Sequence, residues 1–301
     1  MEKKIILAGG SGFLGKSAAL FFKNLGYNVI VLSRSNSHES EGLKYIQWDA
    51  CNIGEWINEL ENSVAIVNFT GKSVNCIYTE KNKKEIIDSR VNSVRVLDQA
   101  ILKLKHPPEV LIQSASLAIF GNNRNECFEE SPLGEGFSVE VCKIWEAEFN
   151  KIQLPKTRKV ILRIGFVLGK DGGALEPLTQ LAKWFLGGTV GNGKQFISWI
   201  HIDDMNEMFN FCIQNTVSGV FNATGPGPVE NRTFMKFLRQ AVGRPWSPPV
   251  PTLFVKLGAF FIMRADSSLA LTGRNCIPKR FLELGFKFKH TDLEKTLRIL
   301  A

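Results

Sequence analysis

The chain has 301 residues, of which 44% are hydrophobic and 22% are charged, and it carries a net charge of +8. This composition is ordinary for a globular protein and excludes a disordered, collagen-like or coiled-coil chain, while the length suits two domains or one large α/β unit with an appendage. The 37 basic residues are scattered, with no basic stripe interleaved with aromatic residues, so nucleic-acid binding is not predicted.

Short apolar runs alternate with amphipathic stretches through the first half of the chain. The pattern predicts strands buried on both faces at 5–8, 28–32, 45–48, 64–69, 110–114 and 159–164. Between them it predicts helices at 16–25, 53–60, 80–104 and 139–152. Strands that alternate with helices imply right-handed crossovers, so the expected fold class is α/β, with a Rossmann-like doubly wound parallel sheet.

The second half is less regular and is expected to form a smaller, partly helical substrate region. Its patterns predict strands at 196–202 and 220–223 and helices at 178–185 and 233–242. Asp203 is expected to cap the helix that follows the first of these strands. A glycine-rich turn covers 187–193, and the proline-rich stretch 246–251 leads into a helical C-terminal appendage.

The six cysteines include no CxxC pair, and no histidine lies at metal-ligand spacing from them. They are expected to be reduced, mostly buried thiols, and no metal site is predicted. Glycines interrupt the N-terminal apolar run at 9–15, and the apolar run at 253–263 contains Lys256 and is too short to span a membrane. The chain is therefore predicted to be cytoplasmic and not membrane-bound, with its oligomeric state left open.

The strongest motif follows the first strand and opens the first helix. Gly9, Gly12 and Gly15 have the GxxGxxG spacing of a turn that binds the pyrophosphate of a dinucleotide. Small residues are needed because the backbone must approach the phosphates closely, and the free N–H groups of the helix then face them. The residues expected to bind the cofactor here are Gly9, Ser11, Gly12, Phe13, Leu14 and Gly15.

The end of the second strand indicates which dinucleotide is bound. An NAD-selective site usually has an acidic residue there, which binds the ribose 2′-hydroxyl. This chain has Ser33 and Arg34 instead, with no carboxylate until Glu39. Because a guanidinium pairs well with a phosphate, the predicted cofactor is NADP(H).

These motifs resemble the extended short-chain dehydrogenase/reductase superfamily, and downstream segments narrow the resemblance to its atypical epimerase-like subfamily, the YfcH-like NAD(P)-dependent epimerase family. The segments are 67–71, 89–90, 141–146, 163–169, 172–174, 198–204 and a tail with Pro278 and Gly285. The resemblance covers nearly the whole chain. It implies an NADP-binding Rossmann domain over residues 1–170, to which some later segments return, and a substrate-pocket region over 171–301. A C-terminal segment from about residue 247 would be specific to the subfamily.

The resemblance also implies contacts with NADP(H) away from the glycine-rich turn. Asp49 matches the position that reaches the adenine, and Leu168 matches the strand end near the nicotinamide. The end of the fourth strand would pass the cofactor, and two polar residues on the long helix would face it. The residues implied are Asp49, Phe69, Thr70, Gly71, Glu85, Arg90 and Leu168.

The usual catalytic pair of the superfamily is absent. Extended reductases use a Ser and a Tyr-x-x-x-Lys pair, in which the lysine lowers the tyrosine pKa so that the phenol can exchange a proton with the substrate. Ser116 matches the serine, but Ser138 and Cys142 stand at the tyrosine and lysine positions. Cys142 could be a thiol acid or a buried packing residue, and His201 could be a titratable group beside the pocket or a structural histidine.

Two functions are consistent with these residues. The first is an NADP(H)-binding, oxidoreductase-like protein of the epimerase family that acts on an unknown small molecule. The alternative is a non-enzymatic protein that senses NADPH. The missing pair favours the alternative, whereas the glycine-rich turn at 187–193 and residues 199–201 favour a retained substrate pocket.

Overall fold

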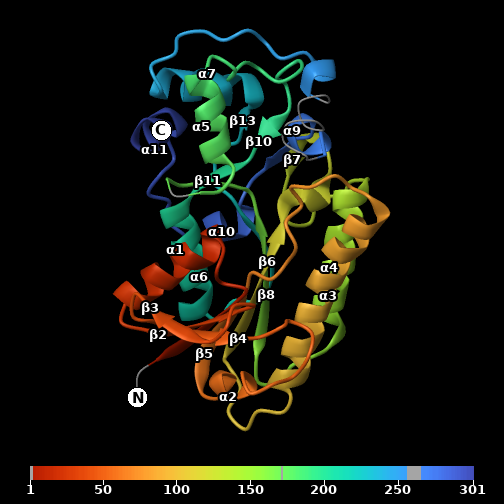
Figure 1. Ribbon diagram of the computed structural model, residues 1–301, viewed down its shortest axis with the longest axis vertical. Coiled ribbons are helices and arrows are strands. Elements are labelled where there is room, and N and C mark those ends of the chain that lie inside the picture. Colours follow the sequence, from red (N-terminus) through yellow and green to blue (C-terminus); the bar gives the residue numbers. More distant parts are fainter. Residues whose placement is uncertain (1–2, 171, 256–265) are drawn as a thin grey trace.

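The computed structural model describes residues 3–170, 172–255 and 266–301. Its centre is an eight-stranded sheet with the strand order β12-β8-β6-β5-β1-β2-β4-β3 (Figure 1). Seven strands are parallel: β1 (Lys4–Ala8), β2 (Asn28–Ser33), β4 (Leu43–Gln47), β5 (Ser63–Asn68), β6 (Val110–Ser116), β8 (Arg158–Ile164) and β12 (Gly219–Ala223). The edge strand β3 (His38–Ser40) is antiparallel to β4. The order changes direction between β1 and β5, which is where doubly wound sheets bind their ligands.

Helices cover both faces of this sheet because successive residues of a strand point to opposite sides. Ile5 and Leu7 pack on one face with α1 and α6, whereas Ile6 and Ala8 pack on the other with α2, α3 and α4. These helices are α1 (Phe13–Asn24), α2 (Ile57–Leu60), α3 (Glu80–Ile101), α4 (Phe137–Lys151) and α6 (Ile202–Gln214). The continuous apolar runs of the strands thus meet a buried environment on both sides.

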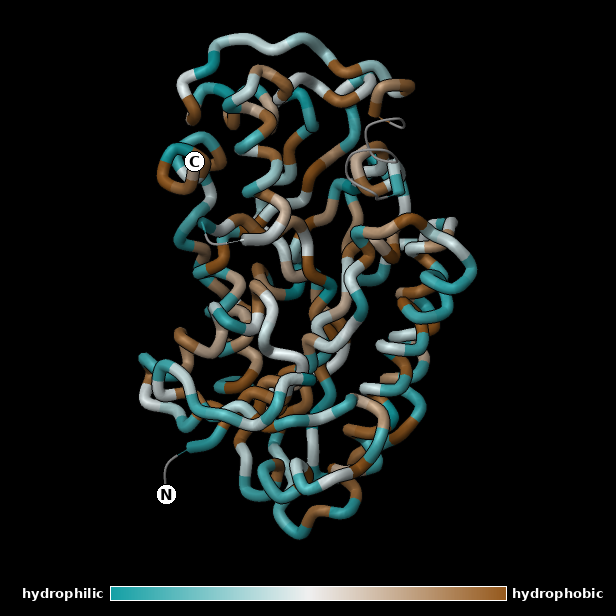
Figure 2. The backbone as a smooth tube through the Cα atoms, in the orientation of Figure 1, coloured by the Kyte–Doolittle hydropathy of each residue, from teal (hydrophilic) through white to brown (hydrophobic). Residues whose placement is uncertain are grey.

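A smaller region lies beyond the carboxyl ends of the parallel strands, at the top of Figure 1. Its helices within the described residues are α5 (Leu175–Lys183), α7 (Asn231–Ala241), α9 (Ser268–Leu271) and α11 (Leu293–Leu300), whereas α10 (Lys279–Glu283) packs on the sheet core through Phe281. Its strand pairs are β9 (Phe166–Leu168) with β11 (Trp199–His201), β10 (Phe196–Ile197) with β13 (Val229–Glu230), and β7 (Asn123–Cys127) with β14 (Arg274–Cys276). The apolar faces of α5, α7 and α11 form a core of their own around Trp199 and Phe234. Figure 2 shows hydrophobic residues inside both regions and hydrophilic residues along the outer loops.

The predicted α/β class with a doubly wound parallel sheet is confirmed by this architecture. Each predicted strand of the first half is present, although the third one is β4, which begins at Leu43, and the first helix begins at Phe13 rather than at residue 16. The single strand predicted at 196–202 is wrong. Ser198 divides it into β10 and β11, because its hydroxyl donates to the Arg274 carbonyl at 2.8 Å and accepts from the Cys276 N–H at 2.8 Å.

No helix of the described ranges is both long and apolar enough to cross a bilayer. The apolar run considered at 253–263 lies mostly outside the described residues. All six cysteines are free, and four of them are buried, as predicted. The strand β12 joins the sheet from the second half of the chain, while the domain boundary at residue 170 stays a prediction.

Candidate functional site

The glycine-rich turn lies between β1 and α1, at the point where the strand order changes direction. Gly9 has φ +69°, and a Cβ there would lie 2.6 Å from Thr70 Oγ1. A Cβ on Gly15 would lie 2.4 Å from the backbone of Gly10. A Cβ on Gly12, in contrast, would meet no atom within 4 Å. Gly12 therefore borders open space in front of the α1 N-terminus, whose first N–H groups have no intrahelical acceptor.

Two side chains of this turn anchor it to the rest of the protein. The Phe13 ring faces Gly169 and Gly173, whose Cβ atoms would lie 2.8 and 2.9 Å from it. Leu14 packs against the core between the sheet and α1. Ser11 is exposed. Of these predicted cofactor residues, Phe13 and Leu14 can offer a phosphate only their backbone, while Ser11 can also offer its hydroxyl.

The ends of β2 and β4 border an open pocket of about 910 Å³ that Arg34 and Asp49 both line. Arg34 is exposed, and its guanidinium has no hydrogen bond or ion pair with any described residue. Ser33 is buried, with its Oγ 2.7 Å from Ser35 Oγ. Asp49 accepts the N–H groups of Cys51 and Asn52, both at 2.8 Å, which lowers its pKa. The pocket is thus lined by the Arg34 guanidinium, which has no partner among the described residues, and by the Asp49 carboxylate, which hydrogen bonds hold in place.

The end of β5 lies on the other side of the glycine-rich turn. Phe69 turns away from it, because its ring packs edge-on against Phe209 with centroids 5.3 Å apart. Thr70 Oγ1 is closed to solvent and has no hydrogen-bond partner among the described residues. A buried hydroxyl without a partner is rare unless a ligand or water supplies one. Gly71 faces the guanidinium of Arg90, whose Cζ would be 3.0 Å from a Cβ there.

The two polar residues predicted on the long helix lie in different surroundings. Glu85 is exposed and pairs with Lys72. Arg90 is half-buried, donates from Nη1 to the carbonyls of Lys72 and Ile86 at 3.0 and 2.9 Å, and lies over the Trp145 ring at 4.9 Å. Burial lowers the pKa of this guanidinium. The structure therefore keeps Arg90 near the end of β5 and separates it from Glu85.

The predicted catalytic serine and cysteine lie close to the end of β6. Ser116 Oγ accepts the Ala118 N–H at 3.1 Å and caps the short 3₁₀ helix Leu117–Phe120. Cys142 is 3% exposed and packs with Phe120 and Cys276 in a small core. Burial, with Glu146 adding to it, raises the pKa of the Cys142 thiol to about 12. These surroundings favour a packing role for Cys142 over a role as a thiol acid.

His201 ends β11, where it is paired in register with Leu168 of β9. Leu168 is fully buried, backbone included, so the structure exposes no part of it to a cofactor. The expectation that Asp203 caps α6 is wrong: His201 is the cap, and its Nδ1 accepts the Asp203 N–H at 3.1 Å. With Nδ1 as an acceptor, a neutral His201 carries its proton on Nε2.

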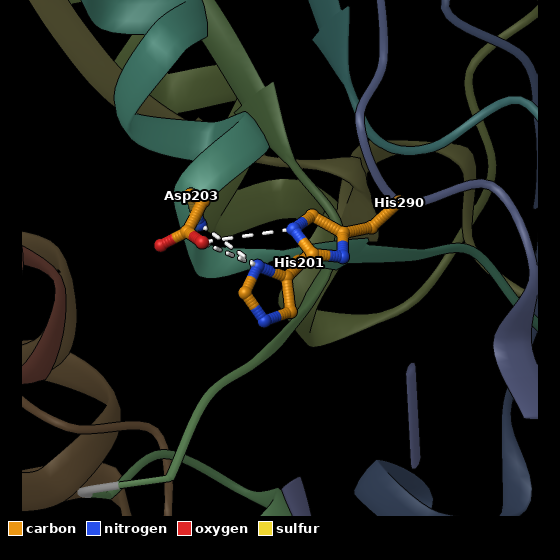
Figure 3. Close-up of side chains that lie close together, drawn as sticks. All are labelled: His201, Asp203 and His290. Carbon is orange, nitrogen blue, oxygen red and sulfur yellow. Dashed lines mark hydrogen bonds and ion pairs between the residues drawn. The ribbon is translucent and has the colours of Figure 1, made fainter. Parts of the chain in front are cut away.

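A second histidine stacks on His201, with ring centroids 3.8 Å apart (Figure 3). Asp203 Oδ2 lies 3.5 Å from His201 Nδ1 and 3.6 Å from His290 Nε2. Burial lowers the His201 pKa, and the charge of His290 lowers it further. The three groups could approach one metal ion. However, the His201 Nδ1 lone pair is already engaged, and the positive end of α6 disfavours a cation. The absence of a metal site stays a prediction.

Three residues near these sites were not predicted from the sequence: His290, Tyr78 and Arg274. Tyr78 Oη and Arg274 Nε are closed to solvent and have no hydrogen-bond partner among the described residues. None of the three lies in a recognisable motif. Tyr78 and His290 belong to residue types that are rare in this chain, which has three tyrosines and four histidines, whereas nothing in the sequence distinguishes Arg274 from the other arginines.

The fold and the turn define a class of protein: a Rossmann-type dinucleotide-binding fold with a further region over the carboxyl edge of its sheet. The chain belongs to the NAD dependent epimerase/dehydratase family, whose model matches residues 5–224. A second model, Domain of unknown function (DUF1731), matches residues 250–300. The resemblance to the extended short-chain dehydrogenases and their epimerase-like subfamily is thereby confirmed.

Several named proteins are similar to this chain over nearly its whole length. The Bacillus subtilis epimerase family protein YfhF is 34% identical over 97% of this chain and 96% of its own. The chloroplastic SDR39U1 homolog of Arabidopsis thaliana is 30% identical over 99% of this chain and 87% of its own. The crystal structure of human epimerase family protein SDR39U1 with NADPH is 29% identical, covers 99% of both chains and has a TM-score of 0.88. A nucleoside-diphosphate sugar epimerase from Corynebacterium glutamicum is 25% identical over the whole of this chain and 58% of its own, with a TM-score of 0.79.

Proposed function

We propose that the protein binds NADP(H) and acts as an oxidoreductase of the epimerase family on a small molecule. The observation that carries the choice of cofactor is Arg34, an exposed guanidinium without a partner among the described residues, at the strand end where NAD-binding proteins place a carboxylate. The human relative solved with NADPH supports the same choice. The open space at Gly12 and the unpartnered Thr70 hydroxyl fit a ligand that passes between them.

Each part of the proposed site has a physical task. The N–H groups at the start of α1 would hold the pyrophosphate, with the positive end of the helix behind them. Arg34 and Ser33 would hold the 2′-phosphate, and Asp49 would lie at the adenine. Thr70 would lie along the nicotinamide half. The bound nicotinamide would supply or accept a hydride, which no side chain can do.

The experiment that tests the cofactor is a calorimetric titration with NADPH and NADH. We expect Arg34→Ala to weaken NADPH binding about tenfold to a hundredfold, because a charge-assisted hydrogen bond is lost. Its affinity for NADH should change little, since NADH has no 2′-phosphate. Arg298→Ala, which removes a charge from the exposed face of α11, is the matched control. An equal loss for both cofactors in Arg34→Ala would contradict the proposed role.

A second function, a non-enzymatic NADPH sensor, is favoured by the residues at the positions of the catalytic pair. Ser138 has no phenol, and the Cys142 thiol is buried and protonated. General acid–base assistance contributes about 10²–10⁴ in rate, so chemistry on nucleotide sugars should be slow or absent despite NADPH binding. Turnover of a nucleotide sugar above about 1 s⁻¹, the scale of ordinary enzymes, would reject this expectation and the sensor function together.

A further inference from the structure

Two arginines approach the position at which related reductases place their catalytic lysine. Cys142 of α4 stands there. Arg90 of α3 lies over the ring of Trp145, three residues after Cys142 on α4, at 4.9 Å, and Arg274 stands two residues before Cys276, which packs with Cys142. The positive charges of Arg90, Arg274 and Arg163 act to lower the pKa of the thiol, against the larger effect of burial, to which Glu146 adds. Cations thus reach the place of the missing lysine from two other elements, one of them in the C-terminal segment.

Arg274 is half-buried and lacks the partners that such a guanidinium normally has. Its Nε is closed to solvent without an acceptor, and its one hydrogen bond to a described residue runs from Nη2 to Thr272 Oγ1 at 3.3 Å. No ion pair joins it to a carboxylate within the described part of the chain. Burial lowers its pKa. A half-buried cation without a counter-ion is unfavourable, and such groups are concentrated at ligand sites.

Arg163, which lies nearby, shows what a structural arginine looks like in the same protein. Its Nε and Nη2 each donate to the Glu146 carboxylate at 2.8 Å, and its Nη1 donates to the Glu129 carbonyl at 2.9 Å. All three nitrogens therefore have acceptors from the protein. Arg274, in contrast, has donors that no described residue accepts, a state that it shares with Arg239, whose Nε is also closed to solvent without a partner among the described residues.

Tyr78 brings a neutral donor to the same place. Its ring lies edge-on to Phe137 with centroids 4.8 Å apart, next to Ser138, the residue at the position of the missing tyrosine. Its Oη is closed to solvent and has no partner that meets hydrogen-bond geometry among the described residues. Burial raises the Tyr78 pKa and the charges of Asp266 and Cys76 add to this, while the nearby Ser138 hydroxyl and the Arg90 charge act to lower it. The phenol is thus protonated at neutral pH and can donate to a ligand oxygen.

We propose that Arg274 and Arg90 form an oxyanion site beside Cys142, with Tyr78 as a neutral donor, and that the ligand is a small organic acid bearing a carboxylate or a phosphate. This rests on the proposed function, since it names the substrate class of that site. It also gives the C-terminal segment a task, because β14 delivers Arg274. A guanidinium suits this task better than an ammonium, since its fork pairs with two oxygens of one oxyanion.

The test is a calorimetric titration of the NADPH-saturated protein with oxalate and with inorganic phosphate at constant ionic strength. Saturation with NADPH blocks the phosphate-binding turn, which would otherwise bind the same probes. We expect binding of at least one probe, weakened about tenfold to a hundredfold in Arg274→Gln and about two- to tenfold in Tyr78→Phe. Arg298→Gln, with the same loss of charge on α11, should bind like the wild type. The two probes distinguish a carboxylate site from a phosphate site.

Two results would overturn the oxyanion site: a wild type that binds NADPH but neither probe, or an Arg274→Gln protein that binds both probes as tightly as the wild type. If Arg274→Gln does not fold, Arg274→Lys keeps the charge without the fork and should still bind several-fold more weakly than the wild type; unchanged affinity would reject the site. Failure of NADPH to bind would reject the proposed function instead. Probe binding by the wild type and by Arg274→Gln would then be compared without cofactor. Because both proteins have the same phosphate-binding turn, a difference between them would still report on Arg274.

Discussion

Gly12 and Gly15 lie three residues apart in one turn, yet the structure requires glycine at them for different reasons. A Cβ on Gly15 would overlap the Gly10 backbone, whereas a Cβ on Gly12 would project into open space. Gly15 is therefore needed for the fold, whereas the fold leaves Gly12 free to vary and only the proposed cofactor binding requires a glycine there.

We expect Gly12→Val to fold and to lose most of its NADPH affinity, because the side chain would fill the space of the pyrophosphate. Valine is a poor N-cap, so a stability loss of about 1 kcal/mol is expected as well. Gly15→Ala, a smaller change, should destabilise the protein by about 1–3 kcal/mol or more through overpacking. Thermal melts and calorimetry on both variants separate the effects. A folded Gly12→Val protein with unchanged NADPH affinity would disprove the role of this turn.

Of the proposed cofactor site, the glycine-rich turn and the Ser33-Arg34 pair can be predicted from the residues themselves, because they lie within one short stretch of chain. The more distant positions, from Asp49 to Leu168, come only from the family resemblance. Glycine spacing and the Ser33-Arg34 pair report directly on one strand–turn–helix unit. Tyr78, Arg274 and His290 reach their positions through loops and through the pairing of β7 with β14. Such long-range contacts leave no periodic pattern in the sequence, and the sequence does not show whether an arginine such as Arg274 lies on the surface or against other residues.

At the scale of elements, one buried ion pair ties α3 to β8. Lys159 Nζ donates to Asp98 Oδ2 at 3.0 Å and to the Ile152 carbonyl at 2.9 Å. Asp98 is 1% exposed. Burial raises its pKa from 3.8 to about 6, although Lys159 acts in the opposite direction. The pair therefore holds α3 against β8. Burial nevertheless makes the ionised form of the Asp98 carboxylate unfavourable.

This contact predicts a pH dependence with a definite sign. Between pH 3.8 and about 6 the native state holds the Asp98 proton that the unfolded state has released, so the free energy of unfolding falls as the pH rises. The difference amounts to about 3 kcal/mol, at about 1.36 kcal/mol per pH unit. Urea unfolding of wild type and Asp98→Asn at pH 4 and pH 7 should show the wild type losing this stability relative to the variant. If the free energies of unfolding of the wild type and Asp98→Asn changed equally between pH 4 and pH 7, Asp98 would have an ordinary pKa.

The strands that the sequence revealed are those buried on both faces, because a short continuous apolar run bounded by turn residues is typical of such a strand. Five described strands were not revealed: β3, β7 and β14 are short and mostly polar, and β9 and β13 have only three and two residues. They form through pairing with a neighbour rather than through a hydrophobic face of their own. The division of 196–202 at Ser198 was missed for the same reason, since it depends on hydrogen bonds to the distant strand β14.

At the scale of the whole molecule, the C-terminal segment is bound back onto the sheet region. Arg280 Nη2 donates to the Ser218 carbonyl at 3.0 Å, just before β12. Asp204 of α6 is fully buried and accepts the backbone N–H groups of Lys289 and His290 at 2.8 and 2.9 Å. The chain that follows Arg274 is therefore fixed to the sheet region within α10 and again after it.

Asp203 and Asp204 are adjacent in the first turn of α6, and the structure predicts a large loss of stability when Asp204 is replaced and a small change when Asp203 is replaced. Asp204→Ala leaves two backbone donors without acceptors, so it should lower the free energy of unfolding by about 2–5 kcal/mol. Asp203 is 58% exposed and should change stability by less than about 1 kcal/mol when replaced by alanine. Urea unfolding gives both values, and amide hydrogen exchange should show faster exchange at residues 287–292 in Asp204→Ala alone. Equal effects of the two substitutions would mean that Asp204 does not hold the C-terminal segment, and that Arg274 is positioned by β14 pairing without it.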